Sequence, residues 1–270
     1  MYRGGVRTMT PRLFSSRGHT LLEMTIALAL GMLIVTGLLS LYRGQRAAFD
    51  RAADAARIYD AGSVALDVLG QQLQMAGFAS GRDSNVEAPI FGCAQGRVVG
   101  AESGASCESL AGRSDGLQVR YAADVVSTWP STGSVPTDCI GQTVSDAIVT
   151  NRFYAKASTS TGEPELYCEG GGRQAQPVLE GIERIRVMYW RAGSPSALDA
   201  SAIARDRWRD VYAADICVLV RGFAIHAKQR TNYTDCNGSP AYADDGRVRQ
   251  VFWRRVTIRN APAMTSGGTQ

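Results

Sequence analysis

The chain has 270 residues, of which 45% are apolar and 20% are charged. This length and composition suffice for a globular core and exclude a wholly disordered chain. Residues 1–18 contain four of the 29 basic residues and no acidic one, which leaves 25 basic and 25 acidic residues in the rest of the chain. The formal net charge of +4 therefore belongs to the N-terminal tip, and the composition excludes a broadly basic surface for nucleic acid on the body.

The first element is an uncharged apolar segment from Met24 to Tyr42. It approaches the roughly 20 residues that a helix needs to cross the hydrocarbon of a bilayer. A secretory signal would have a shorter apolar stretch followed by a small-residue cleavage site, and none follows here. The pattern predicts a retained transmembrane helix over residues 21–41. The basic tip before it places the N-terminus in the cytoplasm and the body on the other side of the membrane.

Glu23 is unusual because a carboxylate at the edge of a membrane helix costs on the order of 3 kcal/mol on insertion scales. One interpretation is that Glu23 only faces the lipid headgroups. The other is that its charge has a function. The sequence around it, Gly18-His19-Thr20-Leu21-Leu22-Glu23, favours the second.

This string, preceded by a basic tip and followed by a long apolar helix, resembles the leader of type IV prepilins. In that family a prepilin peptidase cuts after the glycine and methylates the new N-terminus. The resemblance implies cleavage between Gly18 and His19, with residues 1–18 removed as a leader and His19 methylated. The family prefers phenylalanine or methionine where this chain has His19. Glu23 becomes the fifth residue of the mature chain.

The resemblance also implies a role in assembly for Glu23. The new amino group at His19 is cationic, and Glu23 of one subunit is expected to pair with this amine of its neighbour. Pairing neutralises two charges that are costly in lipid or in a packed helical core. The implied partners are prepilin peptidase, other minor pilins, the major pilin and the inner-membrane assembly platform. The implied location is the bacterial inner membrane, with the body in the periplasm, and later the extracellular pilus.

The long helix is expected to span residues 19–77, because residues 42–76 after the apolar segment contain no proline and are rich in Ala, Leu, Gln and Arg. Asp54 is expected among the polar residues on the solvated side. Gly77 is expected to end the helix. The predicted apolar stripe recurs every three or four residues and consists of Phe49, Ala52, Ala56, Tyr59, Ser63, Leu66, Leu69 and Leu73.

Residues 78–270 form a body in which alternating apolar and polar residues predict an antiparallel sheet. The resulting fold class is α+β: a pilin-like long helix, membrane-spanning in its first half, packed on an antiparallel sheet domain with long disulfide-tied loops. A bulge is expected at Arg254-Arg255, a short helix within 194–208, and long connections over 80–116 and 128–149. The predicted strands are residues 116–121, 151–157, 165–168, 183–190, 215–227 and 248–259.

The six cysteines form an even set without any C-x-x-C pair, which predicts disulfides in an oxidising compartment. Only two histidines accompany them, so a zinc site would need four widely spaced thiolates. Six cysteines allow 15 connectivities. Sequential pairing closes local loops and is the working hypothesis, with the other connectivities left open. In that order the pairs are Cys93 with Cys107, Cys139 with Cys168, and Cys217 with Cys236.

Motifs in the body are similar to those of the PilW family of minor pilins. They include Asp115–Tyr121, Asp138–Gly141, Glu165–Cys168, Pro177–Glu183 and Cys217–Arg221. The resemblance implies that Cys139 and Cys168 pair. It also implies a low-abundance subunit that helps to initiate pilus assembly at or near the tip and supports twitching motility and adhesion.

Candidate chemical sites in the body are weak. His226 follows an apolar strand and is expected to be structural. Asp235, Asn237, Asp244 and Asp245 lie in the 235–247 loop and carry oxygens that suit calcium, but they lack the EF-hand spacing. A solvated turn is the favoured interpretation. No catalytic set, cofactor or metal is predicted.

Two other functions are considered. A minor pseudopilin of a type II secretion system would have the same leader, helix and sheet, and the sequence separates it poorly from a pilus subunit. A membrane-tethered exported enzyme is disfavoured by the lack of a nucleophile–base set in the sequence.

Overall fold

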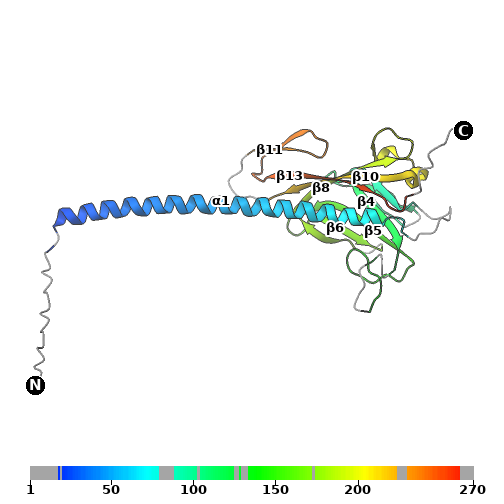
Figure 1. The fold of residues 1–270 in the computed structure, drawn as a ribbon, viewed down its shortest axis with the longest axis horizontal. Coiled ribbons are helices and arrows are strands. Elements are labelled where there is room, and N and C mark those ends of the chain that lie inside the picture. Colours follow the sequence, from blue (N-terminus) through cyan, green and yellow to red (C-terminus); the bar gives the residue numbers. More distant parts are fainter. Residues whose placement is uncertain are drawn as a thin grey trace, which may run out of the picture. The chain divides into compact units, whose positions relative to one another are not determined.

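The structure is a computed structural model that describes residues 18, 20–78, 88–101, 104–124, 128, 133–171, 174–223 and 230–261. The chain divides into two compact units, Met1–Asp50 and Arg51–Gln270. Helix α1 (Leu21–Met75) contributes its first part to one unit and its second part to the other (Figure 1). It begins two residues after the predicted start and ends two residues before Gly77, which adopts a φ of 75°.

The second unit contains thirteen strands among its described residues, and the predicted α+β class is confirmed. Each predicted strand is present, most with shifted ends, and residues 224–227 of the predicted 215–227 strand lie outside the described residues. Strands β1, β2 and β3 occupy part of the 80–116 connection, which was expected to be a loop. The short helix expected within 194–208 is replaced by β9 and two short 3₁₀ helices, Ala200–Ala202 and Arg205–Asp210. The strands are β1 (Ile90–Cys93), β2 (Gly96–Val99), β3 (Ser106–Ser109), β4 (Gly116–Ala122), β5 (Ile148–Ala157), β6 (Pro164–Gly170), β7 (Gln176–Glu180), β8 (Ile182–Arg191), β9 (Leu198–Asp199), β10 (Val211–Arg221), β11 (Thr231–Thr234), β12 (Pro240–Ala243) and β13 (Arg249–Thr257).

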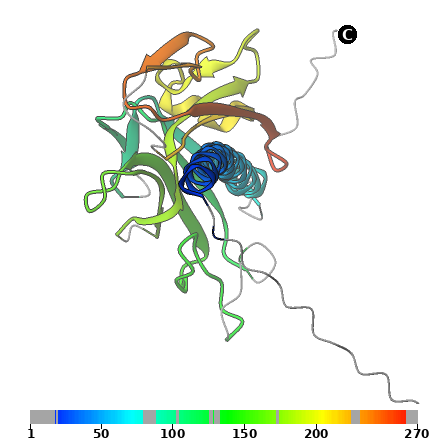
Figure 2. The same ribbon diagram turned by 90° about the vertical axis from the view of Figure 1, so that its left-hand side faces the viewer.

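These strands form two main sheets and two hairpins. The larger sheet has the order β1-β4-β5-β6-β7, and the second has the order β13-β10-β8-β9. Within the described residues, the pairings between these strands are all antiparallel. Within this unit the second part of α1 lies between the two sheets (Figure 2), and one apolar core joins Leu69 and Leu73 of the helix to residues of both sheets.

Alternation along β10 and β8 follows the sequence prediction. Ile216, Val218 and Val220 enter the main core, whereas Cys217 and Leu219 on the opposite face form a small separate cluster with Cys236. The bulge expected at Arg254-Arg255 is wrong, because β13 pairs with β10 without a register shift. Arg254 lies on the same face as Phe252 and Val256, and its guanidinium pairs with Asp67 of the helix. Regular alternation therefore places an arginine on an otherwise apolar face.

The predicted helix face is correct only from Leu66 onward. Tyr59, at 66% exposure, lies on the outside together with Ala52 and Ala56, and Phe49 in the first unit is also exposed. The buried positions are instead Asp54, Ile58, Gly62, Ala65, Leu66, Leu69, Gly70 and Leu73. Glycine residues weaken the apolar periodicity of the face that is buried. Gly62 nevertheless permits the close approach of β13, because a Cβ at this position would overlap the ring of Phe252.

Two glycines on this face provide a matched test of that contact. Gly62→Ala is expected to lower the free energy of unfolding by about 1 kcal/mol, because displacing the Phe252 ring outweighs the better helix propensity of alanine. Gly70→Ala is the control. Its Cβ would meet its nearest neighbour at an ordinary 3.5 Å, so it is expected to gain about 1 kcal/mol. Urea denaturation of the full-length protein in detergent measures both; a stabilising Gly62→Ala would contradict the packing.

The two main sheets are joined by buried polar groups next to β4. The Ser114 hydroxyl accepts hydrogen bonds from the N–H groups of Ala155 and Ile185, which belong to different sheets. The Asp115 carboxylate accepts from the N–H groups of Gln95 and Val187, at 2.8 Å and 2.9 Å. Burial raises the pKa of Asp115 above its usual range despite these bonds.

Arginine–carboxylate pairs also lie at the end where β13 begins, and the pair of Arg247 with Glu163 joins the two sheets. Arg247 donates two hydrogen bonds to Glu163 of the β5–β6 turn, and Arg249 bridges Asp245 and Glu183 of β8. The hydrogen bonds from Arg247 hold the pKa of Glu163 below its usual range, and those from Arg249 do the same for Asp245.

Because the pKa values of these carboxylates are lowered in the folded state, the pairs stabilise the fold at pH values above about 4, which is the pKa of such carboxylates in the unfolded chain. Their contribution is lost as the pH falls through the lower folded values. Arg247→Gln is therefore expected to lower the melting temperature at pH 7 and to differ much less from the unsubstituted protein at pH 3. Arg207→Gln is the control, because Arg207 is 53% exposed in its pair with Asp210. A deficit of Arg247→Gln that is equal at both pH values would contradict this account.

Candidate assembly and membrane segment

Helix α1 begins with a reciprocal pair of hydrogen bonds between Thr20 and Glu23. The Thr20 N–H donates to the Glu23 carboxylate at 2.9 Å, and the Glu23 N–H donates to the Thr20 hydroxyl at 3.3 Å. This is a capping box, which satisfies two N–H groups at a helix start. The T-x-x-E spacing was visible in the sequence, and its capping role was missed. Gly18 is exposed, and His19 lies outside the described residues.

The first part of α1 presents apolar side chains on all sides. From Leu21 to Tyr42, every large apolar residue is between 49% and 83% exposed. Among the described residues, α1 is the one helix that is long and apolar enough to cross a membrane. Exposure of so much apolar surface requires a bilayer or other protein around it.

The hydroxyl groups within this apolar stretch are satisfied inside the helix. Thr25 donates to the Leu22 carbonyl at 2.8 Å, Thr36 to the Met32 and Leu33 carbonyls at 2.9 Å, and Ser40 to the Gly37 carbonyl at 2.8 Å. A buried hydroxyl without a hydrogen bond would be costly in lipid. These internal hydrogen bonds make the three hydroxyl residues compatible with a hydrocarbon environment. Glu23 is an ionisable residue at the start of this apolar stretch.

The six cysteines form three disulfides in sequential order: Cys93–Cys107, Cys139–Cys168 and Cys217–Cys236, with Cα–Cα distances of 5.5, 6.3 and 5.7 Å. The first joins β1 to β3. The second ties the connection between β4 and β5 to β6, and the third pins the β11–β12 hairpin to β10. They fasten peripheral segments to the sheets.

The acidic residues of the 235–247 loop are not gathered into one site. Asp235 accepts hydrogen bonds from the Asn237 and Ser239 N–H groups and closes a turn, Asp244 pairs with Arg230, and Asp245 pairs with Arg249. In the described part of the chain, no group of three or more His, Cys, Asp or Glu residues is placed to hold a metal ion. His226 lies outside the described residues.

Asp54 was expected on the solvated side of the helix but is only 4% exposed. One carboxylate oxygen accepts the Phe223 N–H at 2.8 Å, while the other is buried without a hydrogen-bond partner. A Cβ at Gly222 would overlap this carboxylate, so the glycine permits the contact. The sequence contained no signal for it, because an aspartate in a helix normally faces water.

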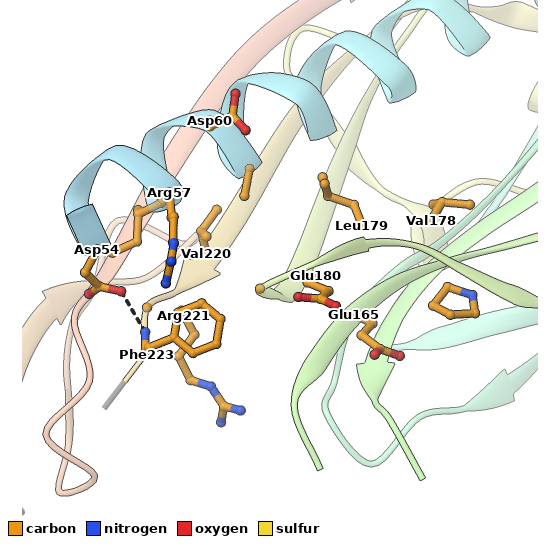
Figure 3. Close-up of a pocket in the computed structure, with 15 residues that line it drawn as sticks. Asp54, Arg57, Asp60, Glu165, Val178, Leu179, Glu180, Val220, Arg221 and Phe223 are labelled. Atoms are coloured by element: carbon orange, nitrogen blue, oxygen red, sulfur yellow. Dashed lines mark hydrogen bonds between the residues drawn. The ribbon is translucent and has the colours of Figure 1, made fainter. Parts of the chain in front are cut away.

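Asp54 lines a groove of about 680 Å³ in the second unit. In Figure 3, Asp54 and Arg57 of α1 and Phe223 form one side, with Glu165 of β6 and Glu180 of β7 on the other. The Arg57 guanidinium lies 5.3 Å from the centre of the Phe223 ring. The sequence contains no local signal for this groove, because its walls come from segments far apart in the chain.

Comparison with known proteins gives a match to a family model and a similarity to solved structures. Residues 152–260 match the model of the family described as type IV pilus-assembly protein W, PilW. A type IV-like pilin from Thermus thermophilus is similar at 14% identity, with 76% of this chain and 98% of that chain covered and a TM-score of 0.42. No curated protein matches the chain. The matched residues include three of the body motifs on which the predicted resemblance rests, Glu165–Cys168, Pro177–Glu183 and Cys217–Arg221.

Proposed function

We propose that the chain, whose residues 152–260 match the PilW family model, is a minor pilin that helps to initiate pilus assembly and is incorporated at or near the tip. Such pilins are structural proteins that interact with other pilus components. In this proposal the subunit supports twitching motility and adhesion and catalyses no reaction. Its specific partners are the major pilin, other minor pilins and the inner-membrane assembly platform.

The observation that carries the proposal is the apolar first part of α1, which is exposed on all sides and begins with the Thr20–Glu23 capping box just after Gly18. We propose that prepilin peptidase cleaves between Gly18 and His19, so that residues 1–18 are lost and His19 is methylated. The apolar segment then anchors the subunit in the inner membrane, with the N-terminus at the cytoplasmic face and the body in the periplasm. On assembly the same surface leaves the lipid and packs against other subunits.

Glu23 guides this transfer in the proposed mechanism. In the single subunit its carboxylate accepts the Thr20 N–H, which holds the charge at the N-terminal edge of the helix. In the filament it pairs with the cationic amine of His19 on a neighbouring subunit. A subunit in the wrong axial position leaves both charges unpaired, so the pairing also selects the register.

The alternative is a minor pseudopilin of a type II secretion system. Deletion of the gene distinguishes the two functions when surface pili, twitching and secreted enzymes are scored in the same strain. The proposed function predicts fewer pili and less twitching with normal secretion, restored by the intact gene. Normal piliation with loss of secreted enzymes would favour the pseudopilin.

A further inference from the structure

The groove beside Asp54 exposes a sheet edge. Strand β7 is the last strand of the larger sheet, and among the described residues it pairs with β6 alone. Residues 177–181, which include most of β7, line the groove. An uncovered strand edge offers main-chain hydrogen-bonding groups to another strand.

The ladder between β6 and β7 shows which main-chain groups face outward. The Gly181 N–H donates to the Pro164 carbonyl at 2.7 Å, so these two residues form a hydrogen-bonded pair. Hydrogen-bonded and non-hydrogen-bonded pairs alternate along an antiparallel ladder. The adjacent pair, Glu165 and Glu180, is therefore non-hydrogen-bonded, and the N–H and C=O groups of Glu180 point away from β6.

The same pair places two carboxylates opposite each other. Side chains are closest in non-hydrogen-bonded pairs, and like charges there are destabilising. Glu165 is 8% exposed and accepts the Tyr167 hydroxyl at 2.6 Å, but in the described part of the chain neither glutamate has an ion pair. Across the groove, Asp54 keeps one buried oxygen without a hydrogen bond.

The arginines on the groove walls do not balance these carboxylates. Arg221 pairs at 3.1 Å with Glu163, which lies outside the groove, and Arg57 stacks on Phe223. Beside the carboxylates, Val178 is 39% exposed and offers apolar contact. The site therefore combines an open strand edge, two adjacent carboxylates that form no ion pair in the described part of the chain, and an apolar side chain.

We infer that the free edge of β7 binds an extended segment of another pilus subunit, which adds a strand and places a lysine or arginine against Glu165 and Glu180. Main-chain bonds to Glu180 supply affinity, and the basic side chain supplies selectivity. The two adjacent carboxylates of Glu165 and Glu180 favour a partner strand that carries a basic side chain. The identity of the partner as a pilus subunit rests on the proposed function, whereas the edge and its preference for a basic strand do not.

A labelled nine-residue peptide, Ser-Gly-Thr-Val-Lys-Val-Thr-Gly-Ser, and its variant with Glu in place of Lys serve as probes. Their binding to the full-length protein in detergent is measured by fluorescence anisotropy. The Lys peptide is expected to bind more tightly than the Glu peptide. Glu180→Gln is expected to weaken binding of the Lys peptide about threefold through the lost charge pair.

Glu180→Pro also removes the outward N–H without breaking a bond to β6, and is expected to cost about a further fivefold. Asp206→Asn, a change at an exposed residue outside the groove, is the matched control and is expected to bind as the unsubstituted protein does. Glu180→Gln provides the test even if the proline variant fails to fold.

Absence of binding, equal binding of both peptides, or equal binding by the unsubstituted protein and Glu180→Gln would overturn the inference. Concentration-dependent self-association that Glu180→Gln abolishes would assign the edge to a second copy of this chain and also overturn it. These measurements do not involve pili. A protein that binds the Lys peptide as expected but is absent from pili would therefore contradict the proposed function and leave the strand-edge site standing.

Discussion

Glu23→Gln is expected to deplete the protein from sheared pili by at least about tenfold, because it leaves the amine of a neighbouring subunit without its partner in a packed helical core. Glutamine still accepts the Thr20 N–H, so the capping box and the start of α1 remain. Gly18 is unchanged, so leader cleavage is expected to proceed. The protein should accumulate as a processed, membrane-bound subunit, quantified by immunoblotting of membrane and sheared fractions.

Two further variants separate charge pairing from helix capping. Glu23→Val removes both functions and should be depleted at least as strongly as Glu23→Gln. Thr20→Ala removes the hydroxyl that caps the Glu23 N–H but keeps the charge, and should enter pili almost as the unsubstituted protein does. If Glu23→Gln entered pili normally while Glu23→Val did not, Glu23 would act only as a helix cap.

The largest expected effect on stability comes from removing the Cys139–Cys168 disulfide. The bond spans 29 residues and joins the connection before β5 to the buried Cys168 of β6. Its loss through Cys139→Ala/Cys168→Ala is expected to lower the free energy of unfolding by about 3–4 kcal/mol, mainly by freeing the unfolded chain. Guanidinium denaturation of the full-length protein in detergent measures the change.

Limited proteolysis shows whether the effect is local. Cys139→Ala/Cys168→Ala should expose residues 133–147 to cleavage, whereas Cys217→Ala/Cys236→Ala should leave that segment protected and loosen the β11–β12 hairpin instead. Identical cleavage patterns in the two variants would contradict the separate roles of these bonds. Free thiols in protein isolated from the periplasm would contradict the oxidised framework as a whole.

Sequence patterns predicted the strands well where one face meets an apolar core. The alternation of Ile216, Val218 and Val220 against Cys217 and Leu219 fixed the orientation of β10, because a shift of one residue would turn the apolar set outward. The long helix at residues 21–41 was also predicted, since an uncharged apolar run of this length is typical of a continuous helix.

The buried face of α1 beyond its apolar first part was harder to predict. The sequence contains an apolar stripe through Tyr59, but the fold uses the neighbouring face, where Gly62 admits Phe252 and Asp54 accepts the Phe223 N–H. Close approach of a strand depends on a missing side chain, and a buried aspartate depends on one distant N–H group. Neither contributes to apolar periodicity.

The groove could not be predicted for a similar reason. Glu165 and Glu180 lie 15 positions apart in the sequence, and their pairing depends on the β6–β7 register. The opposing wall comes from α1 and the end of β10. Such a site is a product of topology, so single-sequence reasoning has no local signal for it.

The central claim, that this chain is a processed subunit of the pilus, is tested most directly by mass spectrometry of its N-terminus in sheared pili. The account predicts a peptide that begins at His19 and carries one methyl group, in the same fraction as the major pilin. Protein that still retains residues 1–18 in a piliated strain, or that is processed but absent from the pilus fraction, would contradict it.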